Sequence, residues 1–156
     1  GIRYRDVTGV QTCALPILWN SFSTAQVCEI PMDITFVIDA SMCDDLGNWD
    51  RMLKFVKTLV TFCNVAPAMG RVSLVIFSTD ANMVLKFNSL NGNLLNSEEV
   101  SKRITALQCE KGSRRIDKAL DLVGKQVLTQ ENGMRDVSRV NTITRLKILR
   151  LFHKNS

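Results

Sequence analysis

Two side chains that can bind a cation stand together early in the chain, directly after a run of apolar residues. The run Ile34–Ile38 is rich in β-branched and aromatic residues, and Asp39 and Ser41 follow it. An apolar run without polar alternation predicts a strand that is buried on both faces. Ligand sites in open α/β sheets collect just past the carboxyl ends of such strands. The carboxylate and hydroxyl oxygens of Asp39 and Ser41 therefore suit a hard cation such as Mg²⁺.

Residues that support catalysis are scarce. The single histidine, His153, lies in a basic C-terminal segment, which removes most Ser/His or Cys/His nucleophile schemes. Gly124-Lys125 lacks the rest of a phosphate-binding P-loop, and no Gly-x-Gly-x-x-Gly follows a strand. We therefore expect no enzyme. A nucleotide-dependent enzyme on a doubly wound sheet is the less favoured alternative. Protection of the chain against thermal unfolding by a bound nucleotide would support it.

Strands and helices alternate along the body of the chain, which predicts an α/β fold. The expected strands are Ile34–Ile38, Arg71–Phe77 and Met83–Phe87, the last two joined as an antiparallel hairpin. A first helix, with Asn48 as its N-cap, has an apolar face of Trp49, Leu53, Val56, Val60 and Cys63. A short helix from Ser97 turns inward Val100, Ile104 and Leu107, and a later helix turns inward Ile116, Ala119, Leu120, Val123 and Val127.

Three segments in this order resemble the von Willebrand factor type A (vWA) domain of extracellular matrix and adhesion proteins. They read ITFVIDAS, RVSLVIFS and GSRRIDKAL, and the resemblance covers residues 28–138, the N-terminal part of such a domain. It implies a partial doubly wound, Rossmann-like fold. The central sheet is mostly parallel with one antiparallel edge strand, helices cover both faces, and the C-terminal strands are missing.

The resemblance also implies a metal ion-dependent adhesion site, which the family builds from Asp-x-Ser-x-Ser, a threonine and the aspartate of Thr-Asp-Gly. Asp39 and Ser41 match the first loop, but Cys43 replaces its second serine, and a thiol is a poor ligand for Mg²⁺. Arg114 falls on the threonine position, where a guanidinium has no lone pair to offer and repels a cation. The third-loop aspartate has no counterpart. We expect a degenerate site that binds no metal strongly.

Two roles for Asp39 and Ser41 stay open. Asp39 and Ser41 with water would hold a weakly bound Mg²⁺ or Mn²⁺. Alternatively, they only cap the following helix, or Asp39 pairs with Arg114, whose charge then occupies the place of the metal. We favour the structural alternative.

Both ends of the chain depart from the family pattern. The residues Val7–Ile17 match the translation of a sequencing-library adapter, so we predict that residues 1–17 are non-native and that residues 18–27 are a linker. After the loop Gly133–Val137, residues 139–156 form a basic tail that does not follow the family. A changed reading frame or splice junction near Arg139 is favoured over a diverged terminus.

That tail matters for the sheet, because the family places a fourth strand beside the first. The segment Ile143–Phe152 either fills this slot as a strand or forms a basic amphipathic helix. An unfilled slot leaves a long apolar strand edge, which is an aggregation hazard. We expect poor solubility unless the slot is filled.

Four cysteines lie outside the adapter-like segment, namely Cys28, Cys43, Cys63 and Cys109. Their even number fits disulfides in a secreted domain, and the three pairings stay open. The resemblance implies that Cys28 pairs with a cysteine beyond this fragment. Cys63, on an apolar helix face, fits a small buried hydrophobe.

Composition limits the class of partner. The 156 residues are 46% apolar and suffice for one domain, and no apolar run reaches the length of a membrane span. The net charge of +5 resides in the ends, because residues 18–138 carry −1, so we expect no nucleic-acid partner. The resemblance implies a secreted, extracellular module that binds a protein ligand such as collagen or another matrix protein. A non-functional assembly fragment of such a protein is the alternative.

Overall fold

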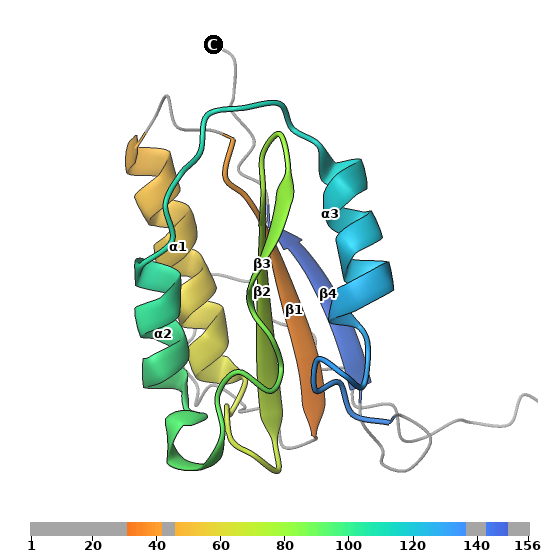
Figure 1. The fold of residues 1–156 in the computed structure, drawn as a ribbon. Helices are drawn as coiled ribbons and strands as arrows, with labels where there is room; N and C mark the ends of the chain where they lie inside the picture. Colours follow the sequence, from red (N-terminus) through yellow and green to blue (C-terminus); the bar gives the residue numbers. More distant parts are fainter. Residues whose placement is uncertain (1–30, 42–45, 137–142, 150–156) are drawn as a thin grey trace, which may run out of the picture.

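The computed structural model describes residues 31–41, 46–136 and 143–149. In chain order the elements are β1 (Met32–Asp39), α1 (Leu46–Phe62), β2 (Gly70–Phe77), β3 (Ala81–Leu85), α2 (Ser97–Thr105), α3 (Ile116–Leu122) and β4 (Ile143–Leu149). The strands form one sheet in the order β3-β2-β1-β4, with α1 and α2 on one face and α3 on the other (Figure 1). The predicted α/β class, with a mostly parallel sheet and an antiparallel edge strand, is confirmed.

β1 is the centre of the sheet and is buried along its whole length. Its apolar side chains alternate between the two faces, as the strand period of two requires. Met32, Ile34, Phe36 and Ile38 pack into the larger core cluster with α1 and α2. Val37 joins the smaller cluster with Ala119 and Val123 of the α3 side. Because helices cover both faces of the sheet at β1, the run Ile34–Ile38 shows no polar alternation.

The predicted apolar face of α1 is confirmed, because all five of its residues are buried. Asn48 as N-cap is wrong, since α1 begins two residues earlier at Leu46 and Asn48 lies within the first turn. At the other end, a Cβ on Gly70 would lie 2.1 Å from the carbonyl oxygen of Cys63. Only glycine allows the chain leaving α1 to pass so close to the start of β2.

The hairpin of β2 and β3 is antiparallel, as predicted. β3 is displaced from the predicted Met83–Phe87 to Ala81–Leu85, because the turn is tighter than expected. The backbone N–H of Ser78 already donates to the carbonyl of Asp80. Phe87 therefore follows the strand, although its side chain is still buried in the smaller core cluster.

The two remaining helices differ in how well their faces were predicted. In α2, Val100 and Ile104 are buried, as is Leu107 just beyond it. In α3 and the π-helical turn Val123–Val127, the buried residues are Ala119, Val123 and Val127. The inward prediction for Ile116 and Leu120 is wrong, since they are 40% and 43% exposed. Against the sheet, α3 packs mainly on β2 and β3, so a narrow stripe of it is covered.

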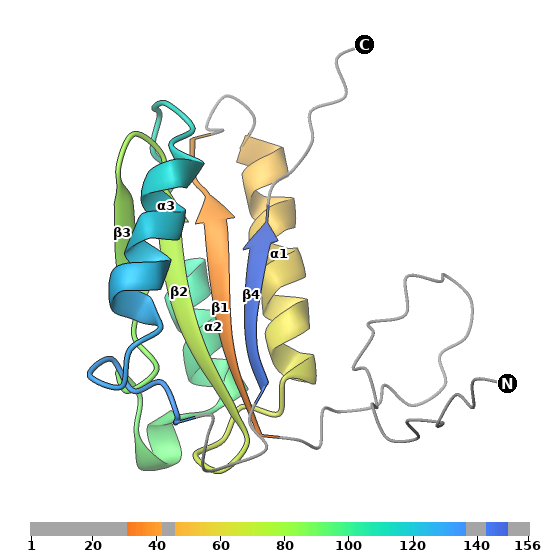
Figure 2. The same cartoon turned by 90° about the vertical axis from the view of Figure 1, so that its right-hand side faces the viewer.

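β4 fills the slot beside β1 and runs parallel to it, from Ile143 opposite Met32 to Leu149 opposite Ile38 (Figure 2). Of the two alternatives for the tail, the structure shows the strand. The adapter-like segment, the linker, Cys28 and Cys43 lie outside the described residues. The predicted domain boundaries therefore stay predictions.

The loop before β4 is anchored by a buried ion pair at the start of β1. Arg135 Nε lies 3.1 Å from Asp33 Oδ1, and the Arg135 backbone N–H donates to Asp33 Oδ2 at 2.8 Å. The Arg135 guanidinium also donates to the carbonyl of Met69. Burial lowers the pKa of Arg135, although the nearby Asp33 carboxylate opposes this shift. The pair fixes the path of the chain toward β4.

Candidate functional site

Asp39 ends β1 at the carboxyl edge of the sheet, and its side chain is 2% exposed. Its Oδ1 accepts hydrogen bonds from the Ser41 backbone N–H at 3.0 Å and from Ser41 Oγ at 2.6 Å. The intervening Ala40 donates its N–H to the carbonyl of Phe77 at 2.8 Å, which ties the start of the loop to β2. Asp39 and Ser41 are therefore brought together, as predicted.

The second carboxylate oxygen of Asp39 is incompletely paired. Asp39 Oδ2 is buried and has no hydrogen-bond partner among the described residues. The positive group beside it is Arg114, whose Nε lies 4.0 Å away and whose side chain is 47% exposed. A buried carboxylate needs a compensating charge or hydrogen bond. Asp39 thus presents a half-satisfied oxygen toward Arg114.

The position of Arg114 follows from a tight contact between two loops. A Cβ on Gly112 would lie 2.3 Å from Thr79 Oγ1, so glycine permits the close approach. The Ser113 N–H donates to Thr79 Oγ1 at 3.0 Å, and the Arg115 N–H donates to the Ser78 carbonyl at 2.9 Å. These bonds hold the segment before α3 on the β2–β3 turn and place Arg114 near Asp39.

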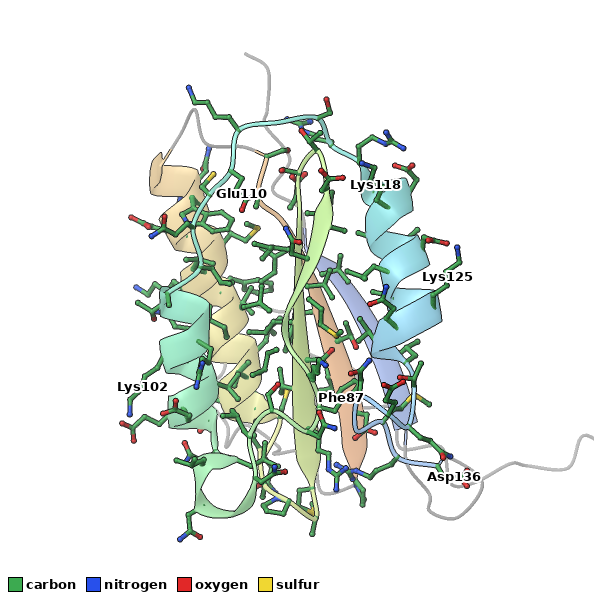
Figure 3. All side chains as sticks on the ribbon, viewed as in Figure 1. Phe87, Lys102, Glu110, Lys118, Lys125 and Asp136 are labelled. Carbon is green, nitrogen blue, oxygen red and sulfur yellow. The ribbon has the colours of Figure 1, made fainter. Side chains whose placement is uncertain are left out.

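Two further oxygen-bearing side chains at this edge were missed by the sequence analysis. The Glu110 backbone N–H donates to the Ala40 carbonyl at 2.8 Å, and Glu110 Oε2 lies 3.5 Å from Ser78 Oγ. Figure 3 shows Glu110 on the segment that leads from α2 across this end of the sheet. Ser78 carries a usable signal, because it comes directly after β2, just as Asp39 stands at the end of β1. Glu110 carries none, since its place depends on the path of a loop.

The residues of this edge do not fit a strong Mg²⁺ site. Within residues 31–41, 46–136 and 143–149, Asp39 and Ser41 are the family ligands that lie here, and Cys43 lies outside these ranges. Among the described residues, no three His, Cys, Asp or Glu side chains are grouped so that they would hold a metal. The guanidinium of Arg114 lies beside Asp39 Oδ2, the carboxylate oxygen that Ser41 does not bond. A cation there would meet like charge.

The outer surface of α3 carries charges that already have partners. Lys118 pairs with Asp80, Lys125 with Asp121 at 2.7 Å, and Arg115 with Asp117 at 2.6 Å. The Arg115 hydrogen bond lowers the pKa of Asp117 to about 2. Lys118 and Lys125 project from this surface in Figure 3, and Lys118 lines a hollow of about 540 Å³ between α3 and β3. Paired, solvated charges of this kind favour a surface without chemistry of its own.

No helix in the described part of the chain has the length and apolar character needed to cross a membrane.

Similar folds occur in crystal forms of proximal thread matrix protein 1 from the mussel byssus. One form has a TM-score of 0.67 at 20% identity and covers 83% of this chain and 32% of that protein. Another has a TM-score of 0.65 at 22% identity, with coverages of 76% and 30%. A form with a zinc-occupied adhesion motif has a TM-score of 0.62 at 19% identity, with coverages of 79% and 30%. The chain therefore spans about a third of the length of these proteins, and the likeness shows a shared fold.

The comparison with known families identifies the family as well as the fold. The family model described as the von Willebrand factor type A domain matches residues 33–146, which is well over half of the chain and includes the start of β4. The match takes in both Asp39 and Arg114. The chain belongs to the von Willebrand factor type A domain family.

Proposed function

We propose that this chain is a protein-binding module of the adhesion type whose metal ion-dependent site is degenerate. The observation that carries the proposal is the contact of 4.0 Å between Arg114 Nε and Asp39 Oδ2, an oxygen with no hydrogen-bond partner in the described part of the chain. The guanidinium supplies the positive charge that a buried carboxylate needs. Arg114 then acts as a tethered cation, and ligand binding requires no metal.

The exposure of Arg114 gives this charge a second use. A guanidinium has five N–H donors, and its contact with Asp39 engages only one side of it. The rest is free to bind a carboxylate of a protein ligand, as arginine commonly does with two parallel hydrogen bonds. A ligand side chain of aspartate or glutamate therefore suits this edge of the sheet.

The family and its neighbours support the setting of the proposal. Domains of this family are generally non-catalytic binding modules. The similar folds belong to a protein named as a matrix protein. We accordingly propose a secreted, extracellular parent protein and a matrix ligand, for which fibrillar collagen is the first probe. Catalysis is no part of the proposed function.

The test measures binding of the whole chain to immobilised fibrillar collagen in Mg²⁺ and in EDTA. We expect equal binding in both. Arg114→Glu should lose at least about tenfold in affinity, or about 1.4 kcal/mol, because it replaces the donor to the ligand carboxylate with a group of like charge. Arg115→Glu, which changes the neighbouring exposed arginine, is the matched control. Binding that disappears in EDTA would refute the tethered-cation role.

A second measurement follows the metal directly. Titration of the chain with Mn²⁺ in a calorimeter should give no saturable heat up to about 1 mM. Arg114→Thr restores a family ligand and removes the repulsive charge, so it should gain measurable Mn²⁺ affinity. If the unaltered chain already binds Mn²⁺ at micromolar concentration, Arg114 does not replace the metal.

A further inference from the structure

The sequence contains two Asn-Gly pairs, Asn91-Gly92 and Asn132-Gly133. In such a pair the backbone nitrogen of glycine can attack the side-chain amide carbon of asparagine, because glycine has no side chain to obstruct the approach. The attack requires that this nitrogen is not engaged in a hydrogen bond and that the asparagine backbone can rotate. The two pairs differ in both respects.

The glycine nitrogen of the first pair is available. Gly92 is exposed and is the first residue of the 3₁₀ helix Gly92–Leu94. The first N–H groups of a helix have no partner within it. Within the described ranges, no acceptor for the Gly92 N–H is found outside that helix either. The nitrogen can therefore act as a nucleophile without first breaking a hydrogen bond.

The backbone around Asn91 is weakly restrained. It is extended, with φ −132° and ψ 155°, so the following peptide must rotate before its nitrogen faces the amide carbon. Two bonds of 3.2 Å oppose this rotation, from Asn91 Nδ2 to the Asn88 carbonyl and from the Leu94 N–H to the Asn91 carbonyl. A Cβ added to Gly92 would meet nothing within 4 Å, so neighbouring atoms do not block the movement. Opening one exposed turn suffices.

The second pair is held in place. Asn132 is 8% exposed, and its Nδ2 donates to the carbonyl of Gln126 at 2.7 Å. The Gly133 N–H donates to the carbonyl of Gln130 at 3.0 Å. A Cβ on Gly133 would lie 2.7 Å from the backbone nitrogen of Asn88, so this turn is packed against another loop. An attack here requires that both hydrogen bonds and the packing open together.

We propose that Asn91 is a site of spontaneous modification in the folded chain, whereas Asn132 is protected. The Gly92 nitrogen loses its proton to solvent and forms a bond to Asn91 Cγ. The bond from Cγ to Nδ2 breaks, and ammonia leaves with the proton. Water then opens the resulting cyclic imide. Cleavage at one carbonyl gives aspartate, and cleavage at the other gives isoaspartate, in which the backbone runs through the former side chain.

The conversion alters the connection between two core residues. Leu90 and Leu95 flank this turn, and both are buried in the larger core cluster. Isoaspartate adds one carbon to the backbone between them, and neither product keeps the amide donor to the Asn88 carbonyl. We expect the isoaspartate form to melt at a lower temperature than the aspartate form, because only the former shifts the two leucines relative to each other.

The turn lies far from the candidate site. Asn88 Nδ2 donates to the Glu131 carbonyl at 3.0 Å, in the segment that leads to Arg135 and thus to Asp33 at the start of β1. Figure 3 shows Phe87 toward this end of the sheet and Glu110 toward the opposite end. The modification should leave ligand binding at Asp39 unchanged. The proposal is therefore independent of the proposed function.

Peptide mapping of the whole chain tests the proposal. The folded chain is incubated in mildly basic buffer and digested with trypsin at mildly acidic pH, which limits conversion during digestion. The two pairs fall in separate tryptic peptides, residues 87–102 and residues 126–135. Fragment masses should show conversion of Asn91 at least about tenfold faster than that of Asn132, which reacts only after its loop opens. Equal rates, or faster conversion of Asn132, would overturn the proposal.

Two controls separate structure from intrinsic reactivity. In urea, both pairs should convert at similar rates, and a difference as large as that in the folded chain would mean that the fold does not select Asn91. Asn91→Gln keeps an amide but requires a larger ring, so it should stop conversion in residues 87–102 and leave Asn132 unaffected. Persistent conversion in that peptide would assign the reaction to another asparagine and refute the proposal.

Discussion

Two buried carboxylates, Asp33 and Asp39, stand at opposite ends of β1 and are paired in different ways. Asp33 has a guanidinium nitrogen of Arg135 at 3.1 Å and a backbone N–H at 2.8 Å. Asp39 has two donors from Ser41 on one oxygen, and Arg114 lies 4.0 Å from the other. The first arrangement closes a loop onto the sheet. The second lies at the carboxyl edge of the sheet beside an arginine whose side chain is 47% exposed, which is why we place the function at Asp39.

Arg135→Met should destabilise the chain by about 3–5 kcal/mol, because it leaves the carboxylate of Asp33 buried without its positive partner. Urea unfolding followed by circular dichroism measures the free energy of unfolding. Lys102→Met removes an exposed pair with Glu98 and is the control, with an expected cost below about 1 kcal/mol. Equal costs for the two variants would mean that the Asp33 pair is solvated.

The pKa of Asp117 should be about 2 in the folded chain, since Arg115 hydrogen-bonds its carboxylate. A depressed pKa means that this interaction stabilises the fold fully above the unfolded pKa, near 3.8, and is lost as the pH falls through about 2. Arg115→Gln should return the midpoint toward 3.8 in a ¹³C carboxyl titration. Arg103→Gln, which alters an ion pair on α2, should not move it.

At the scale of elements, the sequence pattern predicted the helix faces and the two central strands. The buried faces of α1 and α2 follow the helical period, and β1 and β2 follow strongly apolar runs. The start of α1 and the position of β3 were missed, because turn geometry sets them. Ile116 and Leu120 were placed inward since the pattern shows which residues are apolar, but not how much of α3 the sheet covers.

The residues of the candidate site likewise fall into those that the sequence located and those that it missed. Asp39 and Ser41 are neighbours in sequence, so one motif locates both, and the spacing from Gly112 to Ala119 locates Arg114. Ser78 and Glu110 are 32 residues apart and meet only because the segment after α2 crosses the edge of the sheet. No local pattern encodes that path.

α2 offers a prediction about a single element, because its N-cap is well defined. Asn96 Oδ1 accepts the backbone N–H of Glu99 at 2.9 Å. Asn96→Ala should lower the free energy of unfolding by about 0.5–2 kcal/mol, whereas Asn96→Asp keeps the acceptor and should cost little. The two variants are compared by urea unfolding. A larger loss in the aspartate variant would contradict the capping role.

At the scale of the whole molecule, β4 decides whether the sheet has an open apolar edge. A chain that ends at Asn141 lacks β4 and leaves β1 unpaired along seven residues. We expect it to form aggregates in size-exclusion chromatography with light scattering, because such an edge pairs with other chains. A chain that ends at Arg150 keeps the strand and is the control. A monodisperse, cooperatively melting monomer of the shorter chain would disprove the role of β4.

The pairing of β1 with β4 also has a consequence for synthesis on the ribosome. Ile143 is made 111 residues after Met32, its partner in the sheet. At about 5–20 residues per second, β1 waits for about 6–22 s before this neighbour exists. During that interval the nascent chain exposes an apolar strand edge, while α1, β2 and β3 can already fold against the other side. A chaperone that shields strand edges would therefore be needed most between the emergence of β1 and the emergence of β4.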